Sequence, residues 1–181
     1  MPDARVFVKR SRKEIDKVPV PEWARDAIIA AAEWTTMLAP DYLHGLIQKQ
    51  LSLCGKTAAS LVVEGDKPIL FVPAWIANES GDQPGVVLTT TSGAIFAWTE
   101  GRLRLSYIGL AIPYTVVRDI ATPAAPPDYN ASLRVVTGDE TLTAHFSSVR
   151  NTDGPTGFLD AIVASLSGEG SDATRGKALK S

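Results

Sequence analysis

One short stretch of the chain combines side chains that are typical of binding surfaces. It starts at Trp98, continues through Arg102 and Arg104, and has Tyr107 close behind. Tryptophan, tyrosine and arginine dominate the energetics of protein interfaces, because each combines a large contact area with directional polar groups. The sequence therefore predicts a partner-binding site at four positions: Trp98, Arg102, Arg104 and Tyr107. The alternative interpretation is that Trp98 packs inward while both arginines are solvated.

A second cluster of chemistry-bearing residues is basic and lies near the N-terminus. Residues 1–20 carry six basic residues against three acidic ones. Four of the basic residues are close together in sequence: Lys9, Arg10, Arg12 and Lys13. Such a cluster favours weak, salt-sensitive contact with an anionic surface. We therefore interpret residues 1–20 as a flexible basic arm that acts as a solvated tail, with a weak electrostatic contact to nucleic acid or to an anionic membrane surface as the alternative.

The remaining reactive residues form no recognisable catalytic or metal-binding pattern. His44 and His145 are far apart in the chain, and neither has a Cys or His neighbour at the spacing of zinc ligands. Cys54 has no general base close to it in sequence. Residues 170–177 resemble a phosphate-binding loop only superficially, because no Ser or Thr follows Lys177. We therefore expect no enzymatic activity, no cofactor and no metal.

Length and composition limit the architecture. With 181 residues, of which 45% are hydrophobic and 21% charged, the chain can form one well-buried core with accessory elements. The single cysteine and the charged N-terminus, which lacks a signal-like apolar core, lead us to expect a cytoplasmic protein. No apolar run approaches the roughly 20 residues that cross a bilayer, so no integral membrane segment is expected.

Residues 84–121 are expected to form the centre of the fold. Apolar and β-branched runs at 86–90, 94–99 and 103–117 are separated by Ser92-Gly93 and Glu100-Gly101, which favour tight turns. This pattern predicts a meander of antiparallel strands. Further strands are predicted by three more runs, at 69–77, 132–137 and 141–149, of which the last two form a hairpin.

Helical patterns flank the predicted sheet. Residues 21–34 and 40–53 have apolar residues at three-to-four spacing and predict a helical hairpin, which Gly55 would end. The sequence pattern of residues 57–64 is compatible with either a helix or a strand. Residues 155–166 form a further amphipathic helix with Phe158, Ile162 and Leu166 on one face. Residues 167–181 have the composition of a disordered tail.

The predicted strands and the last predicted helix also occur in the order found in a known protein family. The resemblance runs through the sequence segments GVVLT at 85–89, IF at 95–96, IPY at 112–114 and Ile120, and then through the last hairpin and helix. Over residues 65–166 the chain resembles the bacterial pleckstrin-homology (PH-like) families, especially the YokE-like group. The resemblance implies an α+β fold, in which a PH-like antiparallel β-barrel is closed by a C-terminal α-helix. The expected organisation is a basic flexible arm at 1–20, a helical hairpin at 21–55, the barrel with its helix at 56–166, and a disordered tail at 167–181.

The resemblance implies binding more than catalysis, because this fold is a scaffold whose ligands differ among families. Residues 78–85, which correspond to a lipid-binding loop, contain Glu79 and Asp82 and no basic residue, so a phosphoinositide ligand is not expected. Residues 64–166 carry eleven acidic residues against six basic ones, which disfavours nucleic acid. The predicted function is a non-enzymatic protein-interaction module with an unknown protein partner. The alternative is a peripheral membrane or lipid-binding module that uses the basic arm.

Overall fold

The computed structural model describes residues 6–19, 21–23, 26, 44–78, 81–127, 129 and 131–146. These residues form one eight-stranded antiparallel sheet with the order β1-β5-β4-β3-β2-β8-β7-β6. The strands are β1 (Val6–Ser11), β2 (Pro68–Asn78), β3 (Gly81–Thr90), β4 (Gly93–Glu100), β5 (Ser106–Pro113), β6 (Val117–Ala121), β7 (Ala131–Thr137) and β8 (Thr141–Phe146). The helices are α1 (Arg12–Ile15), α3 (His44–Ala59) and the 3-10 turn η2 (Tyr114–Val116).

The central meander and the last hairpin are confirmed. Strands β3, β4 and β5 follow one another along the chain and pair antiparallel, as do β7 and β8. The expected surface loop at 78–85 is shorter than predicted, because β2 extends to Asn78 and β3 begins at Gly81. Asp82 therefore lies on a strand, opposite Ala77 of β2.

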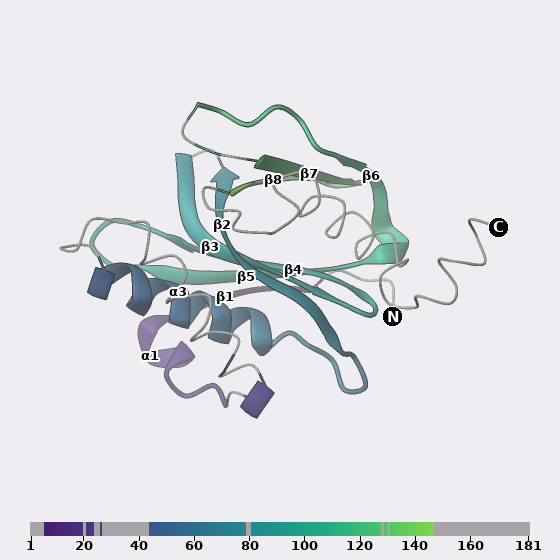
Figure 1. The fold of residues 1–181 in the computed structure, drawn as a ribbon. Helices are drawn as coiled ribbons and strands as arrows, with labels where there is room; N and C mark the ends of the chain where they lie inside the picture. The colour runs from purple at the N-terminus through teal and green to yellow at the C-terminus, as the bar shows by residue number, and fades with distance from the viewer. Residues whose placement is uncertain are drawn as a thin grey trace.

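The sheet bends into two layers around its main core. Strands β6, β7 and β8 lie above β4 and β5 in Figure 1, and the long paired strands β2 and β3 run from the lower layer up to the upper one. Phe96, Leu133 and Phe146 come from β4, β7 and β8 and meet in this core, where each is almost fully buried. Aromatic and branched side chains on the facing sides of the two layers therefore hold the bend together.

Helix α3 covers the other side of β3, β4 and β5 (Figure 1). Cys54 and Ala58 of the helix pack against Leu88 and Ile95 of the sheet in a second core. The helix does not end at Gly55 as predicted; it continues to Ala59. Residues 57–59 are therefore helical, and no strand forms between Ala59 and Pro68.

The expectation of a closed barrel is wrong. Within the described residues the sheet is open, with β1 at one edge and β6 at the other. The strand that the sequence analysis missed, β1, pairs with β5 and thus extends the sheet outward. The expected closing helix at 155–166 and the tail at 167–181 lie outside the described residues, as does most of the first helix of the expected hairpin.

The basic N-terminal segment also differs from the flexible arm that the sequence predicts. Residues 6–11 pair with β5 from Val6 opposite Ala111 to Ser11 opposite Ser106. Ser11 then caps α1, and the Glu14 carboxylate accepts from the Ser11 backbone N–H at 3.1 Å. Ile15, at the end of α1, is fully buried. The segment is therefore docked onto the sheet by backbone pairing and by one apolar anchor.

Candidate functional site

The structure separates the aromatic members of the predicted partner-binding site. Trp98 is 7% exposed and belongs to the core between the layers, whereas Tyr107 is 3% exposed and belongs to the core under α3. The register places Trp98 opposite Ile108, so Tyr107 points to the other face of the sheet. The indole Nε1 of Trp98 donates to Glu100 Oε1 at 3.2 Å. Neither ring therefore contributes a large exposed contact area.

The two arginines of the same predicted site lie on the surface. Gly101 has φ +105°, a conformation that favours glycine, and there the chain leaves β4. Arg102 and Arg104 follow on the exposed loop before β5, because the strand expected at 103–117 begins only at Ser106. Leu103, between them, is 100% exposed. An apolar side chain flanked by two cations thus projects from the β4–β5 loop.

The pairing of β1 with β5 brings the basic N-terminal segment to the same end of the sheet. Ser11 lies opposite Ser106, the first residue of β5, and α1 follows Ser11 directly. Adjacent strands are about 4.8 Å apart, so α1 begins beside the end of the β4–β5 loop. We call this surface the basic end and define it by the following residues: Lys9, Arg12, Lys13, Arg102, Leu103 and Arg104. Arg10 is not included, because it is half-buried and its Nη1 donates to Ser60 Oγ at 2.9 Å.

The acidic groups at this end already have partners. Asp16 Oδ1 lies 3.1 Å from Arg12 Nε, and this contact raises the pKa of the arginine. Hydrogen bonds from Ser11 lower the pKa of Glu14. Within the described part of the chain, no ion pair neutralises the four cations Lys9, Lys13, Arg102 and Arg104. The basic end therefore keeps a local positive charge although the formal net charge of the protein is −2.

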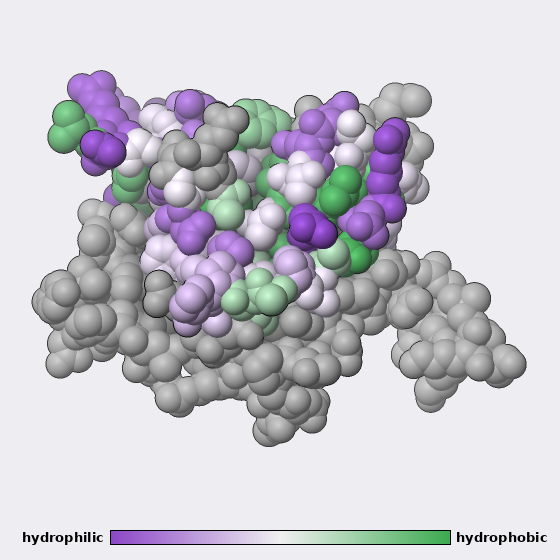
Figure 2. Space-filling view, turned by 90° about the horizontal axis from the view of Figure 1, so that it is seen from above, coloured by the Kyte–Doolittle hydropathy of each residue, from purple (hydrophilic) through white to green (hydrophobic). Residues whose placement is uncertain are grey.

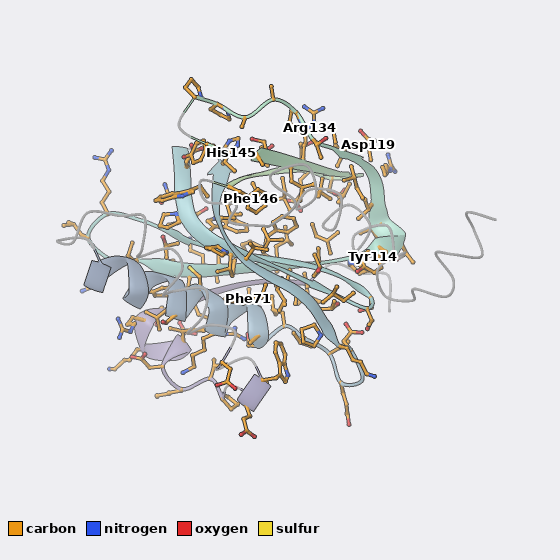
Figure 3. All side chains as sticks on the ribbon, viewed as in Figure 1. Phe71, Tyr114, Asp119, Arg134, His145 and Phe146 are labelled. Atoms are coloured by element: carbon orange, nitrogen blue, oxygen red, sulfur yellow. The ribbon has the colours of Figure 1, made fainter. Side chains whose placement is uncertain are left out.

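A polar cluster that the sequence analysis missed joins the outer face of β7 and β8 to the start of β3. Ser132 Oγ and His145 Nδ1 are 2.6 Å apart, and the two residues are cross-strand partners. The Tyr129 ring stacks on the His145 ring with 4.8 Å between centroids, and its hydroxyl donates to Asp82 Oδ2 at 2.7 Å. Figure 3 shows His145 at the upper layer, with Phe146 turned toward the space between the layers. The only sequence signal for this cluster was the hairpin register that pairs position 132 with position 145.

This cluster is built for structure more than for reaction. Ser132 is fully buried, so its hydroxyl cannot be reached by a substrate, and Tyr129 covers one face of the imidazole. Figure 2 views the molecule from above the layer of β6, β7 and β8, and the surface on this side mixes hydrophilic with hydrophobic groups. The stacking of Tyr129 on His145, together with the buried Ser132–His145 hydrogen bond, therefore fixes the loop at residue 129 to the sheet.

The structure also locates other features considered in the sequence. Within the described ranges, no group of three or more His, Cys, Asp or Glu residues could hold a metal ion. Cys54 is buried in α3, and burial raises its pKa to about 12. Among the described helices, none is long and apolar enough to cross a membrane.

Comparison with known proteins gave distant structural similarities only. No protein-family model matches the chain. No curated protein matches it either. The C-terminal domain of an unknown protein from Leishmania infantum is 16% identical, with a TM-score of 0.40, and the match covers 56% of this chain and 85% of that domain. The Vps36 N-terminal PH domain is 15% identical, with a TM-score of 0.42, and covers 62% and 86% respectively. Similarities at this level identify neither a fold family nor a function, and no family model supports the YokE-like group.

Proposed function

We propose that this protein is a non-enzymatic interaction module that attaches to an anionic membrane surface through its basic end. The observation that carries the proposal is the pairing of β1 with β5, which brings two separate basic segments together around the fully exposed Leu103. The absence of catalysis stays a prediction from the sequence. The membrane interpretation was the alternative in the sequence analysis, and the geometry now favours it over a protein partner.

The burial of two aromatic rings is the reason for this preference. The case for a protein partner depended on Trp98 and Tyr107 lying beside Arg102 and Arg104 as an interface hot spot. Both rings are buried, on opposite faces of the sheet. What remains on the surface is cationic groups and one leucine, and this composition suits the headgroup region of an anionic bilayer.

The expected affinity is modest. A cation close to an anionic leaflet contributes about 1 kcal/mol. Complete burial of a leucine side chain contributes about 1.5 to 3 kcal/mol. Lys9, Lys13, Arg102 and Arg104, which form no ion pair within the described residues, contribute together with Leu103 about 6 kcal/mol, equivalent to a Kd of about 0.04 mM. Because the charges lie on an exposed loop, a strand and a short helix, we expect recognition of surface charge and not of an inositol headgroup.

Co-sedimentation with vesicles tests the proposal. The full chain should bind phosphatidylcholine vesicles that contain about one-third phosphatidylserine, and it should not bind vesicles of phosphatidylcholine alone. The double change Arg102→Gln, Arg104→Gln should abolish most of the binding, and Leu103→Ser should weaken it about tenfold. Arg118→Gln is the matched control, because Arg118 is exposed on β6 at the other edge of the sheet.

Two outcomes would contradict the membrane proposal. One is the absence of binding to the anionic vesicles by a folded full-length chain. The other is binding that the loop variants and the Arg118 control lose equally. Either outcome would return the protein-interaction hypothesis to first place, with Arg102, Leu103 and Arg104 as the residues to test.

A further inference from the structure

A pocket of about 380 Å³ lies at the opposite end of β5 from the basic end. It is bounded by the start of β1, the turn between β3 and β4, and the segment between α3 and β2. Its described lining includes the following residues: Val6, Leu61, Val63, Asp66, Ala111 and Ile112. The size is at the lower end of the range for small-molecule sites, and the walls are mainly aliphatic.

One carboxylate provides the charge of this pocket. Asp66 is the only charged residue among the described lining residues. Its Oδ2 accepts hydrogen bonds from the hydroxyls of Thr90 and Ser92, and its Oδ1 accepts from the hydroxyl of Thr91 at 3.1 Å. Three consecutive hydroxyl residues of the β3–β4 turn therefore fix the carboxylate in place.

The carboxylate has capacity left for a ligand. An ionised carboxylate offers about four acceptor sites, and the three hydroxyls use three of them. No basic side chain of the described residues lies within ion-pair distance of Asp66. The ring of Tyr114 lies near enough for the Asp66 charge to contribute to the raised pKa of its phenol, although burial is the larger cause. Figure 3 shows Tyr114 near the end of β5.

We propose that this pocket binds a small aliphatic amine, whose hydrocarbon body contacts the apolar wall and whose ammonium group donates to Asp66. A cation is favoured because it supplies the opposite charge that the fixed carboxylate lacks. A carboxylic acid of the same length is disfavoured, because it would place a second negative charge beside Asp66. The partial exposure of Val6 and Val63, at 48% and 59%, leaves apolar surface at the mouth for the ligand to cover.

Titration with three probes of equal chain length tests the charge preference on the unchanged full-length protein. The probes are hexylamine, hexan-1-ol and hexanoate, and the readout is the amide chemical-shift change of Thr90 to Gly93. Hexylamine should bind saturably and about tenfold or more tightly than hexanoate, with hexanol between them. Equal binding of hexylamine and hexanoate would overturn the proposal, as would the absence of saturable binding by hexylamine.

Two variants and one control locate the binding. Asp66→Asn should weaken hexylamine binding about tenfold or more and leave hexanol binding unchanged. Ala111→Leu should fill part of the pocket and weaken both probes, and it keeps the proposal testable if Asp66→Asn fails to fold. Asp119→Asn is the matched control, because Asp119 is an exposed acid on β6. Hexylamine binding that survives Ala111→Leu in a folded protein would place the ligand elsewhere.

This inference is independent of the proposed membrane function. The part of β5 from Ser106 to Ala111 separates the loop of Arg102 and Arg104 from the pocket by about 17 Å. Loss of vesicle binding in the Arg102 and Arg104 variant should therefore leave hexylamine binding unchanged. Failure of one proposal is thus distinguishable from failure of the other.

Discussion

Cys54 lies between α3 and the sheet, where its thiol donates to the Pro84 carbonyl at 3.8 Å. Burial raises the pKa of this thiol from 9.0 to about 12. The unfolded chain therefore loses the thiol proton at a lower pH than the folded chain. The resulting stability is fully present below about pH 9 and is lost as the pH rises toward about 12.

We predict that Cys54→Ala makes the loss of stability above pH 9 shallower. One thiol proton accounts for up to about 1.4 kcal/mol per pH unit in the free energy of unfolding. Burial also raises the pKa of Tyr114 to about 12, so this phenol titrates in the same range. Both proteins contain Tyr114, so the difference between their slopes reports the thiol alone. Urea denaturation at a series of pH values measures the slopes. Identical slopes in both proteins would contradict the prediction, and so would rapid alkylation of Cys54 in the native state at neutral pH.

At the scale of elements, sequence patterning was sufficient where neighbouring segments pair with each other. The β3–β4–β5 meander and the β7–β8 hairpin need only alternating apolar residues and a turn between them. Strand β1 is different, because its partner β5 lies about a hundred positions away and half of its own residues are polar. Gly55 misled the assignment of a helix end, because α3 accepts a buried glycine in its interior.

The four residues of the predicted binding site do not form one exposed surface, for a related reason. They are close in sequence, yet the reversal at Gly101 places Trp98 and Tyr107 on neighbouring strands with side chains on opposite faces. Sequence proximity could identify the exposed Arg102 and Arg104 but not the direction of the two rings. The basic end could not be predicted either, because it exists only through the pairing of β1 with β5.

Docking of the N-terminal segment gives a prediction about α1. Ile15→Ala should lower the free energy of unfolding by about 2 to 4 kcal/mol, because it removes a fully buried side chain. Val6→Ala is the control and should have a much smaller effect, since Val6 is partly exposed on the edge strand. Chemical denaturation measures both values. Equal, small effects would show that the segment is not docked in solution, as would cleavage by trypsin between Lys9 and Lys17 in the native protein before any other site.

For the whole molecule, the important property is the separation of charge. The protein has a formal net charge of −2, while one end of its sheet carries four unpaired cations in the described residues. Because the whole protein is slightly negative, only the basic end is attracted to an anionic surface. The attraction therefore acts at short range and only when the basic end faces that surface.

We predict that vesicle binding is strongly salt-dependent. Raising the ionic strength from about 0.1 M to about 1 M shortens the Debye length from about 10 Å to about 3 Å, which screens the cations. Insertion of Leu103 alone contributes only about 1.5 to 3 kcal/mol and cannot hold the protein on the bilayer. Co-sedimentation across this range should show loss of binding, with thermal unfolding in the same buffers as the control. Binding that persists at high salt would point to an apolar contact outside the basic end.

The open sheet has a further consequence for how copies of this chain behave at high concentration. A free strand edge offers unpaired backbone groups to any other strand, and this is a route to edge-to-edge aggregation. Strand β6 limits that risk, because it has only five residues, a register irregularity between Val117 and Asp119, and the exposed charges of Arg118 and Asp119. At the other edge, Lys9 places a charge in the middle of β1. The same lysine that would face a membrane thus also discourages the sheet from growing into a polymer.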